Sequence, residues 1–256
     1  MWLERMSLKM SFYTQKIIKK FGEKAKSGNV EAQCLLAECA MRDGAFKESI
    51  PWLLLAANAG DSWAQYSLGF AYQNGEGVKK DLKKTISWYK RASDAGYDSA
   101  QLNLGIIYAN QKGRARKLKE AVRLYRLAAK QGNANACYNL GLYYEEGRGV
   151  PKDDKKSFQW YLKAAERNKS KAYHRVGYLY HEGIGTRQDS KKAIRWYKKA
   201  AKSGSIYSMY NLGLSYLDGD GVPKNRKLAL KWLSLASKNG HTKAKKILRE
   251  LSEKSL

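Results

Sequence analysis

Residues 133–168 read NANACYNLGLYYEEGRGVPKDDKKSFQWYLKAAERN, and most of the chain repeats this pattern. The pair Leu140-Gly141 returns every 36 residues, with valine in place of leucine in one copy. The other copies are Leu68-Gly69, Leu104-Gly105, Val176-Gly177 and Leu212-Gly213. A fixed period of about 20 to 50 residues is typical of a solenoid, a propeller or an array, so the period decides the class of architecture.

Each copy of the pattern predicts two helices joined by a short loop. In the first helix, Ala136, Leu140 and Tyr144 recur at a spacing of four and form one apolar stripe. Two glycines and a proline follow at 146–151 and indicate a loop. The second helix has an apolar face of its own, formed by Phe158, Tyr161, Leu162 and Ala165. We therefore expect an all-α chain.

The ends of the second helix are marked by residues that favour helix caps. Asp153 or Asp154 is placed to cap its start, because a carboxylate accepts hydrogen bonds from the free N–H groups there. The helix is expected to stop near Asn168, where the other copies have glycine. Asparagine and glycine both tolerate the left-handed conformation that commonly ends a helix.

The pattern resembles the Sel1-like repeat family, which is related to the tetratricopeptide repeat. The family pattern is roughly A-x-x-x-L-G-x-x-Y, a G-x-G-V loop, and then D-x-x-K-A-x-x-W-Y-x-K-A-A. Residues 189–201, DSKKAIRWYKKAA, match the second half of this pattern completely. The resemblance covers about residues 11–250 and implies an all-α, right-handed α-solenoid of two-helix repeats of 36 residues.

The period also predicts how the chain is divided. Residues 1–28 are expected to be a lead-in and a degenerate half repeat that caps one end, and residues 241–256 a capping helix at the other. Terminal units of a solenoid are atypical because one of their faces meets water. Six Sel1-like repeats are expected between the caps, at 29–60, 61–96, 97–132, 133–168, 169–204 and 205–240.

The charge of the chain is its unusual compositional feature. With 49 Lys and Arg against 23 Asp and Glu, the formal net charge is +26. Such a balance indicates polyanionic partners: nucleic acid, an anionic membrane surface or an acidic protein. The alternative is a highly soluble helical surface without a specific role. Three cysteines and no long apolar segment lead us to expect a cytoplasmic protein without a membrane span.

A candidate binding face lies on the first helices, opposite their apolar stripe. In repeat solenoids the first helices usually line the concave surface, where partners bind. Tyrosine offers a large contact area with a polar end, and asparagine can hold a peptide backbone or a carboxylate. The alternative is that these side chains only pack between helices and bridge neighbouring repeats. The predicted partner-binding residues are Tyr66, Asn103, Tyr138, Asn139, His174, Arg175, Tyr210 and Asn211.

The second helices carry a lysine at one position in all five full-length repeats. The family pattern places its lysine one residue later, so this position is a feature of the present chain. Lysine in the first turn of a helix opposes the helix dipole, which suggests that the charge has a use. Repeat duplication that copied a harmless residue is the alternative. The predicted polyanion-binding edge consists of Lys83, Lys119, Lys155, Lys191 and Lys227.

Other patterns give no support for catalysis, a cofactor or a metal. His174 and His181 share a helix face, but zinc needs further ligands, and Glu182 is expected to point elsewhere. Ser87-Trp88-Tyr89-Lys90 matches the S-x-x-K motif of β-lactamases, but the companion S-D-N and K-T-G motifs are absent. We therefore expect a protein without enzymatic activity, and a β-lactam hydrolase is a remote alternative.

Two functions from different classes remain. The resemblance implies a non-catalytic interaction scaffold or adaptor that binds a peptide or an acidic protein on its concave face. Members of the family take part in signalling, in host–microbe contact and in immunity against toxins. The second function is binding of nucleic acid along the lysine edge. Because the tyrosines lie on the first helices and the lysines on the second, the pattern favours separate roles and the protein-binding function.

Overall fold

The computed structural model describes residues 10–111 and 115–253, and in this part every regular element is an α-helix. The first helices of successive repeats, α5, α7, α9, α11 and α13, begin 36 residues apart. The predicted all-α chain of two-helix repeats is therefore confirmed. The helices are α2 (Phe12–Lys26), α3 (Val30–Arg42), α4 (Phe46–Asn58), α5 (Ser62–Asn74), α6 (Leu82–Asp94), α7 (Asp98–Asn110), α8 (Ala115–Lys130), α9 (Ala134–Glu146), α10 (Asp154–Glu166), α11 (Ser170–Glu182), α12 (Ser190–Lys202), α13 (Ile206–Asp218), α14 (Arg226–Lys238) and α15 (Thr242–Glu253).

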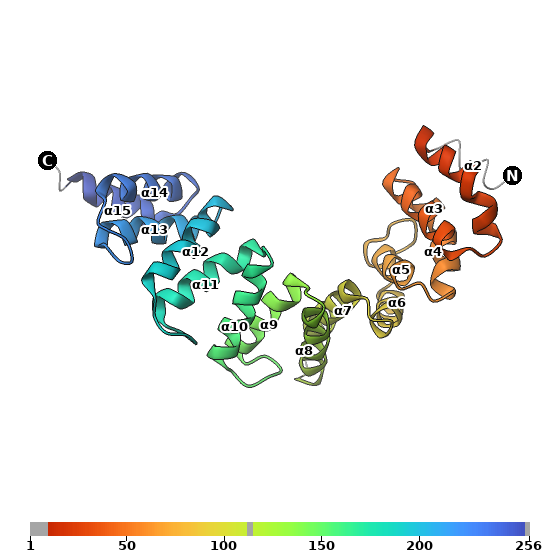
Figure 1. Ribbon diagram of the computed structural model, residues 1–256, viewed down its shortest axis with the longest axis horizontal. Helices are drawn as coiled ribbons and strands as arrows, with labels where there is room; N and C mark the ends of the chain where they lie inside the picture. Colours follow the sequence, from red (N-terminus) through yellow and green to blue (C-terminus); the bar gives the residue numbers. More distant parts are fainter. Residues whose placement is uncertain (1–9, 112–114, 254–256) are drawn as a thin grey trace. The chain divides into compact units, whose positions relative to one another are not determined.

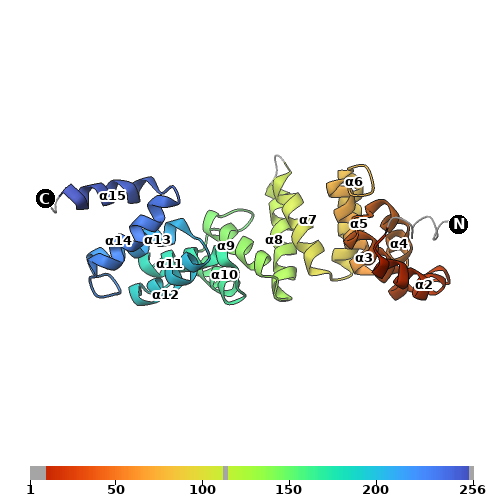
Figure 2. The ribbon, with the colours of Figure 1, turned by 90° about the horizontal axis from the view of Figure 1, so that it is seen from above.

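Contacts divide the chain into two compact units, residues 1–128 and residues 129–256, which we call unit 1 and unit 2. Consecutive helices pack side by side within each unit, for example α5 against α6 in unit 1 and α13 against α14 in unit 2 (Figures 1 and 2). Helix α2 occupies the segment predicted to be a half repeat, and residues 1–9 of the predicted lead-in lie outside the described part. The proposed division into six repeats and two caps stays a prediction.

The capping residues explain where the helices begin and end. Asp153, one of the two predicted candidates, is the cap of α10, and its side chain accepts a hydrogen bond from the Lys156 backbone N–H at 2.9 Å. The same position caps α6, α12 and α14 through Asp81, Asp189 and Asn225. Asn168 has a φ of 60°, so it adopts the left-handed conformation that the sequence predicts.

One contact inside each repeat explains why the Leu-Gly pair recurs. The second helices bury a large side chain at one position, which is tyrosine in α6, α8, α10 and α12 and leucine in α14. The ring of Tyr161 lies so close to Gly141 that a Cβ atom there would meet it at 2.7 Å. Real Cβ atoms essentially never approach a neighbour this closely. The glycine therefore lets the two helices of a repeat approach each other.

The joints between repeats differ between the two units. In unit 1 a buried glutamine of each first helix donates to a carbonyl oxygen near the end of the preceding second helix. Gln33 donates to Ala25, Gln65 to Ala57 and Gln101 to Ser93. In unit 2 the same position is occupied by Cys137, Tyr173 and Met209, which are less polar or bulkier. The joints of the two units are therefore built with different chemistry.

Candidate partner-binding face

Unit 2 brings three of the predicted partner-binding residues to one pocket. Tyr138 of α9 and His174 and Arg175 of α11 line a pocket of about 610 Å³, which we call the Lys171 pocket. Sequence reasoning missed two other lining residues, Lys171 and Tyr207. Each lies three residues before a predicted position in its own helix, and this spacing is the signal that could have found them. The turn between α12 and α13, residues 203–205, completes the wall.

His174 forms the neutral part of this pocket. Its Nδ1 atom lies 2.9 Å from the hydroxyl oxygen of Ser208, and its ring packs against the rings of Tyr197 and Tyr207 at 5.9 and 5.8 Å. Burial, together with the charge of Arg175, lowers the pKa of His174 to about 4. The imidazole is therefore uncharged near neutral pH, and the basic charge of the pocket comes from Lys171 and Arg175.

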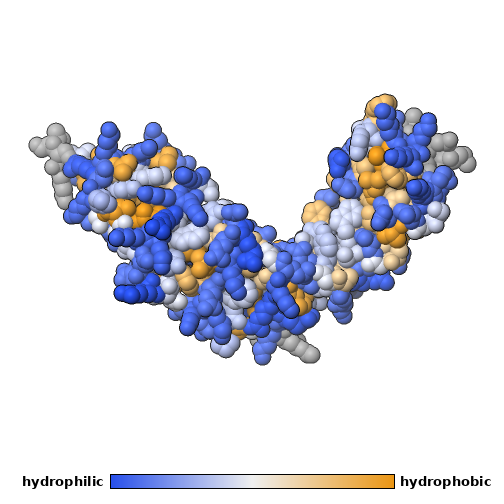
Figure 3. Space-filling model, in the orientation of Figure 1, coloured by the Kyte–Doolittle hydropathy of each residue, from blue (hydrophilic) through white to orange (hydrophobic). Residues whose placement is uncertain are grey.

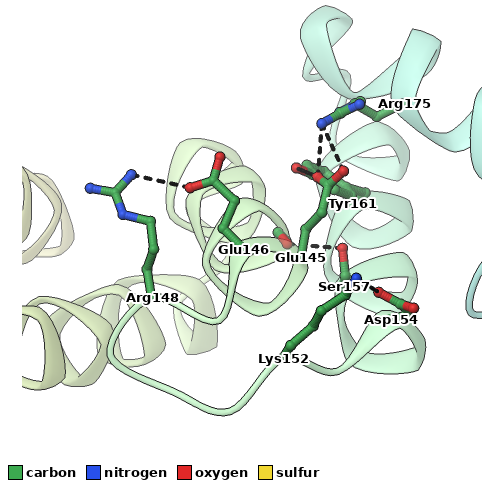
Figure 4. A network of polar contacts seen from close by, with 9 residues as sticks. Glu145, Glu146, Arg148, Lys152, Asp154, Ser157, Tyr161 and Arg175 are labelled. Carbon is green, nitrogen blue, oxygen red and sulfur yellow. Dashed lines mark hydrogen bonds and ion pairs between the residues drawn. The ribbon is translucent and has the colours of Figure 1, made fainter.

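Arg175 is held by the neighbouring repeat. One nitrogen of its guanidinium donates to both carboxylate oxygens of Glu145 at 2.8 and 2.9 Å, and the hydroxyl of Tyr161 donates to the same carboxylate at 2.7 Å (Figure 4). The ion pair joins α9 to α11. Arg175 therefore has the bridging role that the alternative interpretation of this face gave to its residues, and it also lines the Lys171 pocket.

A second pocket of unit 2 lies beside α11 and α13, and it is acidic. Its volume is about 280 Å³, and we call it the Asp218 pocket. The predicted residue Asn211 lines it and hydrogen-bonds to Tyr197. The remaining lining residues are Tyr178, His181, Glu182, Leu214, Ser215, Asp218 and Asp220. The sequence did not reveal this pocket because its acids come from two repeats.

The expectation that Glu182 points away from its neighbouring histidine is wrong. The Nδ1 atom of His181 lies 2.8 Å from the carboxylate of Glu182, and its Nε2 atom lies 3.0 Å from Asp220. The two side chains therefore meet at the end of α11, where Glu182 is the last helical residue. In the described part of the chain, no group of three or more ligand side chains is placed to hold a metal.

Two further predicted residues of unit 2 have different surroundings. The ring of Tyr210 stacks on that of His241 at 4.2 Å, which places it beside the start of α15. Asn139 is half-buried on α9 and lines neither of the two pockets described. The eight predicted residues therefore do not form one site, and the structure separates them by pocket and by unit.

In unit 1 the two predicted residues, Tyr66 and Asn103, contact each other. Asn103 donates to the hydroxyl oxygens of Tyr66 at 3.5 Å and Tyr89 at 3.3 Å, so it bridges neighbouring repeats. Tyr66 also packs against Tyr97 at 5.0 Å, and burial raises the pKa of its hydroxyl. It helps to line a pocket of about 260 Å³, together with Met41, Phe46, Ser49, Trp63, Ser67, Phe70, Ala71 and Glu76.

The predicted lysine edge lies on the surface of both units. Within the described residues, all five lysines are exposed and none forms an ion pair; they are Lys83 and Lys119 in unit 1 and Lys155, Lys191 and Lys227 in unit 2. Two of the lysines one position later behave differently, since Lys156 and Lys192 pair with the capping aspartates at 2.9 and 3.3 Å. Ser87 of the S-x-x-K match is exposed in the middle of α6.

The fold and its pocketed face define a helical-repeat protein of the interaction type. The model of the Sel1 repeat family matches residues 64–97, 98–133, 134–169, 170–205 and 206–241. These matches cover more than half of the chain, which therefore belongs to the Sel1 repeat family. Proteins of this family generally mediate protein–protein interactions and are typically not enzymes.

Two solved structures resemble the chain over most of its length. One is a protective antigen of uropathogenic Escherichia coli strains, with 31% identity and a TM-score of 0.85 over 93% of this chain. The chain spans 52% of that protein's length. The other is a Sel1 repeat protein from Oxalobacter formigenes, with 31% identity and a TM-score of 0.73 over 84% of this chain and 86% of that one. None of the curated proteins compared with the chain matches it.

The surface carries many charged residues, and hydrophilic side chains cover much of the face shown in Figure 3 in both units. Among the described helices, none is long and apolar enough to cross a membrane.

Proposed function

We propose that the protein is a non-catalytic scaffold that binds a peptide or an acidic protein segment on the first-helix face of unit 2. The observation that carries the proposal is the Lys171 pocket. Its volume of about 610 Å³ lies in the range of ligand pockets, and three of its lining residues were expected on a binding face from the sequence alone. Tyrosine and histidine rings supply contact area in it, and hydroxyl and amino groups supply hydrogen bonds.

Charge favours an acidic partner. The net charge of +26 would speed the encounter with such a partner and make the association rate sensitive to salt. Lys171 is exposed at the pocket and forms no ion pair in the described part of the chain, so its ammonium group is available to a partner carboxylate.

We place the protein in the cytoplasm, since its three cysteines are all unpaired.

A displayed library of random peptides, selected on the full chain, tests this proposal. Peptides that bind the wild type should lose affinity for Tyr207→Ala, because Tyr207 is 65% exposed and its removal takes contact area from the pocket without disturbing the core. Gln159→Ala is the matched control, since Gln159 is exposed on α10 and lines no pocket described here. Selected peptides that bind Tyr207→Ala as tightly as the wild type would contradict the proposal.

The exposed lysines favour a second function, binding of nucleic acid along the second helices. None of the five lysines forms an ion pair within the described residues, so their charge is not used there. Lys83, Lys155 and Lys191 stay unpaired although each lies two residues after a capping aspartate. Each phosphate contact releases counterions, and affinity for an oligonucleotide should therefore fall steeply with salt.

A charge-reversal variant tests the second function. The triple variant Lys83→Glu, Lys119→Glu and Lys155→Glu should no longer bind a single-stranded or double-stranded oligonucleotide in a fluorescence anisotropy titration. Lys171→Glu is a single-site control on the other helices. Oligonucleotide affinity that is unchanged in the triple variant would exclude the lysine edge, and co-purified nucleic acid that high salt removes would support it.

A further inference from the structure

The first-helix face of unit 2 carries two pockets of opposite charge, arranged one after the other along α11 and α13. We propose that this face binds a peptide segment with one acidic and one basic group, the acidic group in the Lys171 pocket and the basic group in the Asp218 pocket. This inference rests on the proposed function and specifies the partner: a charge-paired peptide rather than a uniformly acidic one.

The Lys171 pocket suits a carboxylate. Its lining residues include two basic side chains and no aspartate or glutamate. Lys171 is free of ion pairs in the described structure, and Arg175 shares its charge with Glu145 from outside the pocket. The hydroxyl of Ser205 and the start of α13 lie in the wall, where the positive end of the helix dipole also favours an anion. Hydroxyl groups and aromatic rings complete a site for one acidic side chain.

The Asp218 pocket suits a cation. Three carboxylates line it, those of Glu182, Asp218 and Asp220, and no lysine or arginine does. This composition is the opposite of the chain as a whole, which has 49 basic and 23 acidic residues. His181 contacts Glu182 and Asp220 but not Asp218, which is exposed and forms no ion pair in the described part. The ring of Tyr178, which is half-buried, offers a face to which a cation is attracted.

The acidic residues also stand where a helix disfavours them. Glu182 and Asp218 are the last residues of α11 and α13, and a negative charge there opposes the helix dipole. The same two helices carry the basic pocket near their other ends. At both pockets a charge therefore opposes the helix dipole, and a partner group of opposite charge would offset this cost.

The spacing of the pockets fixes the spacing of the two groups in the peptide. His174 and His181, one from each pocket, are seven residues apart on α11, which corresponds to ~10 Å at the rise of an α-helix. Tyr207 and Asp218 on α13 are eleven residues apart, or ~16 Å. An extended peptide rises by ~3.3 Å per residue, so its acidic and basic residues should be about three to five positions apart.

The Asp218 pocket also makes nucleic acid an unfavourable partner for this face, unlike for the lysine edge. A nucleic acid that approached the Lys171 pocket would bring further phosphates against the three carboxylates of the Asp218 pocket. Like charges placed opposite each other at an interface disfavour the wrong partner. The observations therefore favour a peptide on this face. If the triple lysine variant no longer binds an oligonucleotide, that result concerns the lysine edge and leaves this inference intact.

Charge-swap rescue on the full chain tests the inference. Peptides from the displayed library should be enriched in an acidic and a basic residue about three to five positions apart. For a synthetic peptide of that sequence, Lys171→Glu and Asp218→Lys should each raise the Kd by about tenfold, as measured by fluorescence anisotropy. Replacing the acidic residue of the peptide by lysine should restore binding to Lys171→Glu, and replacing the basic residue by glutamate should restore binding to Asp218→Lys.

Matched variants keep the outcomes distinct. Lys163→Glu and Glu166→Lys make the same charge changes at exposed positions of α10, outside both pockets and the lysine edge, and they should leave the Kd unchanged. Peptides that depend on Tyr207 but show neither the paired charges nor the rescue would overturn the inference and leave the proposed function standing. If no selected peptide depends on Tyr207, the proposed function itself fails, and the inference fails with it.

Discussion

Gly141 shows how a single residue determines the distance between two helices. Its backbone lies against the ring of Tyr161, a side chain with no solvent exposure. The equivalent glycine of the next repeat, Gly177, meets the ring of Tyr197 in the same way. A methyl group at either position would have to displace a fully buried ring, and well-packed interiors resist such a change.

Gly141→Ala should therefore destabilise the protein although alanine is the better helix former. Alanine gains about 1 kcal/mol in helix propensity, but overpacking a buried site costs about 1 to 3 kcal/mol, and here the neighbouring ring is fully buried. We expect a lower free energy of unfolding, measured by urea titration. Asn135→Ala on the exposed side of α9 is the control and should be neutral or stabilising. Equal stability of Gly141→Ala and the wild type would show that the ring can move.

His174 should make stability depend on pH in a defined window. Its pKa is about 4 in the folded protein against 6.5 in a free histidine, because burial and Arg175 disfavour the charged form. Between these values the unfolded chain binds a proton that the folded chain does not, so the free energy of unfolding falls as pH decreases from 6.5 to 4. The loss should be on the order of 1 to 3 kcal/mol.

The comparison with His174→Gln isolates this effect from the other titrating groups. The difference in free energy of unfolding between wild type and variant should change across the window, as measured by urea titration at several pH values. A difference that stays constant from pH 7 to pH 4 would mean that His174 titrates normally.

Single residues also show what sequence can and cannot predict. The left-handed Asn168 was predictable because the local backbone alone requires it. The contact between His181 and Asp220 was not predictable, because Asp220 belongs to the next repeat. Helical spacing grouped Tyr138, His174 and Arg175, which line one pocket, but spacing cannot tell that Arg175 pairs with Glu145.

At the scale of the helix, the caps are regular enough to be read from the sequence. The second helices α6, α10, α12 and α14 begin after an aspartate or asparagine whose side chain accepts from the third residue of the helix. The choice between Asp153 and Asp154 needed the structure, because both residues have the right chemistry and lie next to each other. Pockets between helices could not be predicted, since they depend on neighbouring repeats.

Asp189 provides a test of the caps. The hydrogen bond from the Lys192 backbone N–H lowers the pKa of Asp189 below its usual value. The stability it adds is present at neutral pH and is lost as pH falls through the folded pKa. Asp189→Ala should lower the thermal midpoint at pH 7, and Asp189→Asn should lower it less, because Asn225 caps α14 with the same geometry. An alanine variant as stable as the wild type would rule out this role.

At the scale of the whole molecule, charge opposes folding. The net charge of +26 creates repulsion that is larger in the compact state than in the unfolded chain. Raising the ionic strength from about 0.01 to 0.5 M shortens the screening length severalfold and should raise the urea midpoint. A midpoint that falls with salt would show that local ion pairs, such as Lys156 with Asp153, outweigh the repulsion.

The architecture of the whole chain was predictable for a simple reason: a repeated sequence has to form a repeated structure. The period gave the two-helix unit, and the family comparison agrees with it. The separation of charge on unit 2 was hidden, because the acids of the Asp218 pocket come from α11, α13 and the loop that follows α13, and the net charge of the chain points the other way.

The contact between Gly141 and Tyr161 lies within one repeat, and this has a consequence for how such a chain can change over generations. Loss or gain of a block of 36 residues by recombination leaves every such contact whole, so length can change without a new core. The contacts between successive repeats limit which blocks can be exchanged. The buried glutamines of unit 1 bond to carbonyl oxygens of the preceding helix, and the side chains of Cys137, Tyr173 and Met209 at the same position in unit 2 differ from them in polarity or size. A block copied within its own unit should therefore be inherited more readily than one moved into the other.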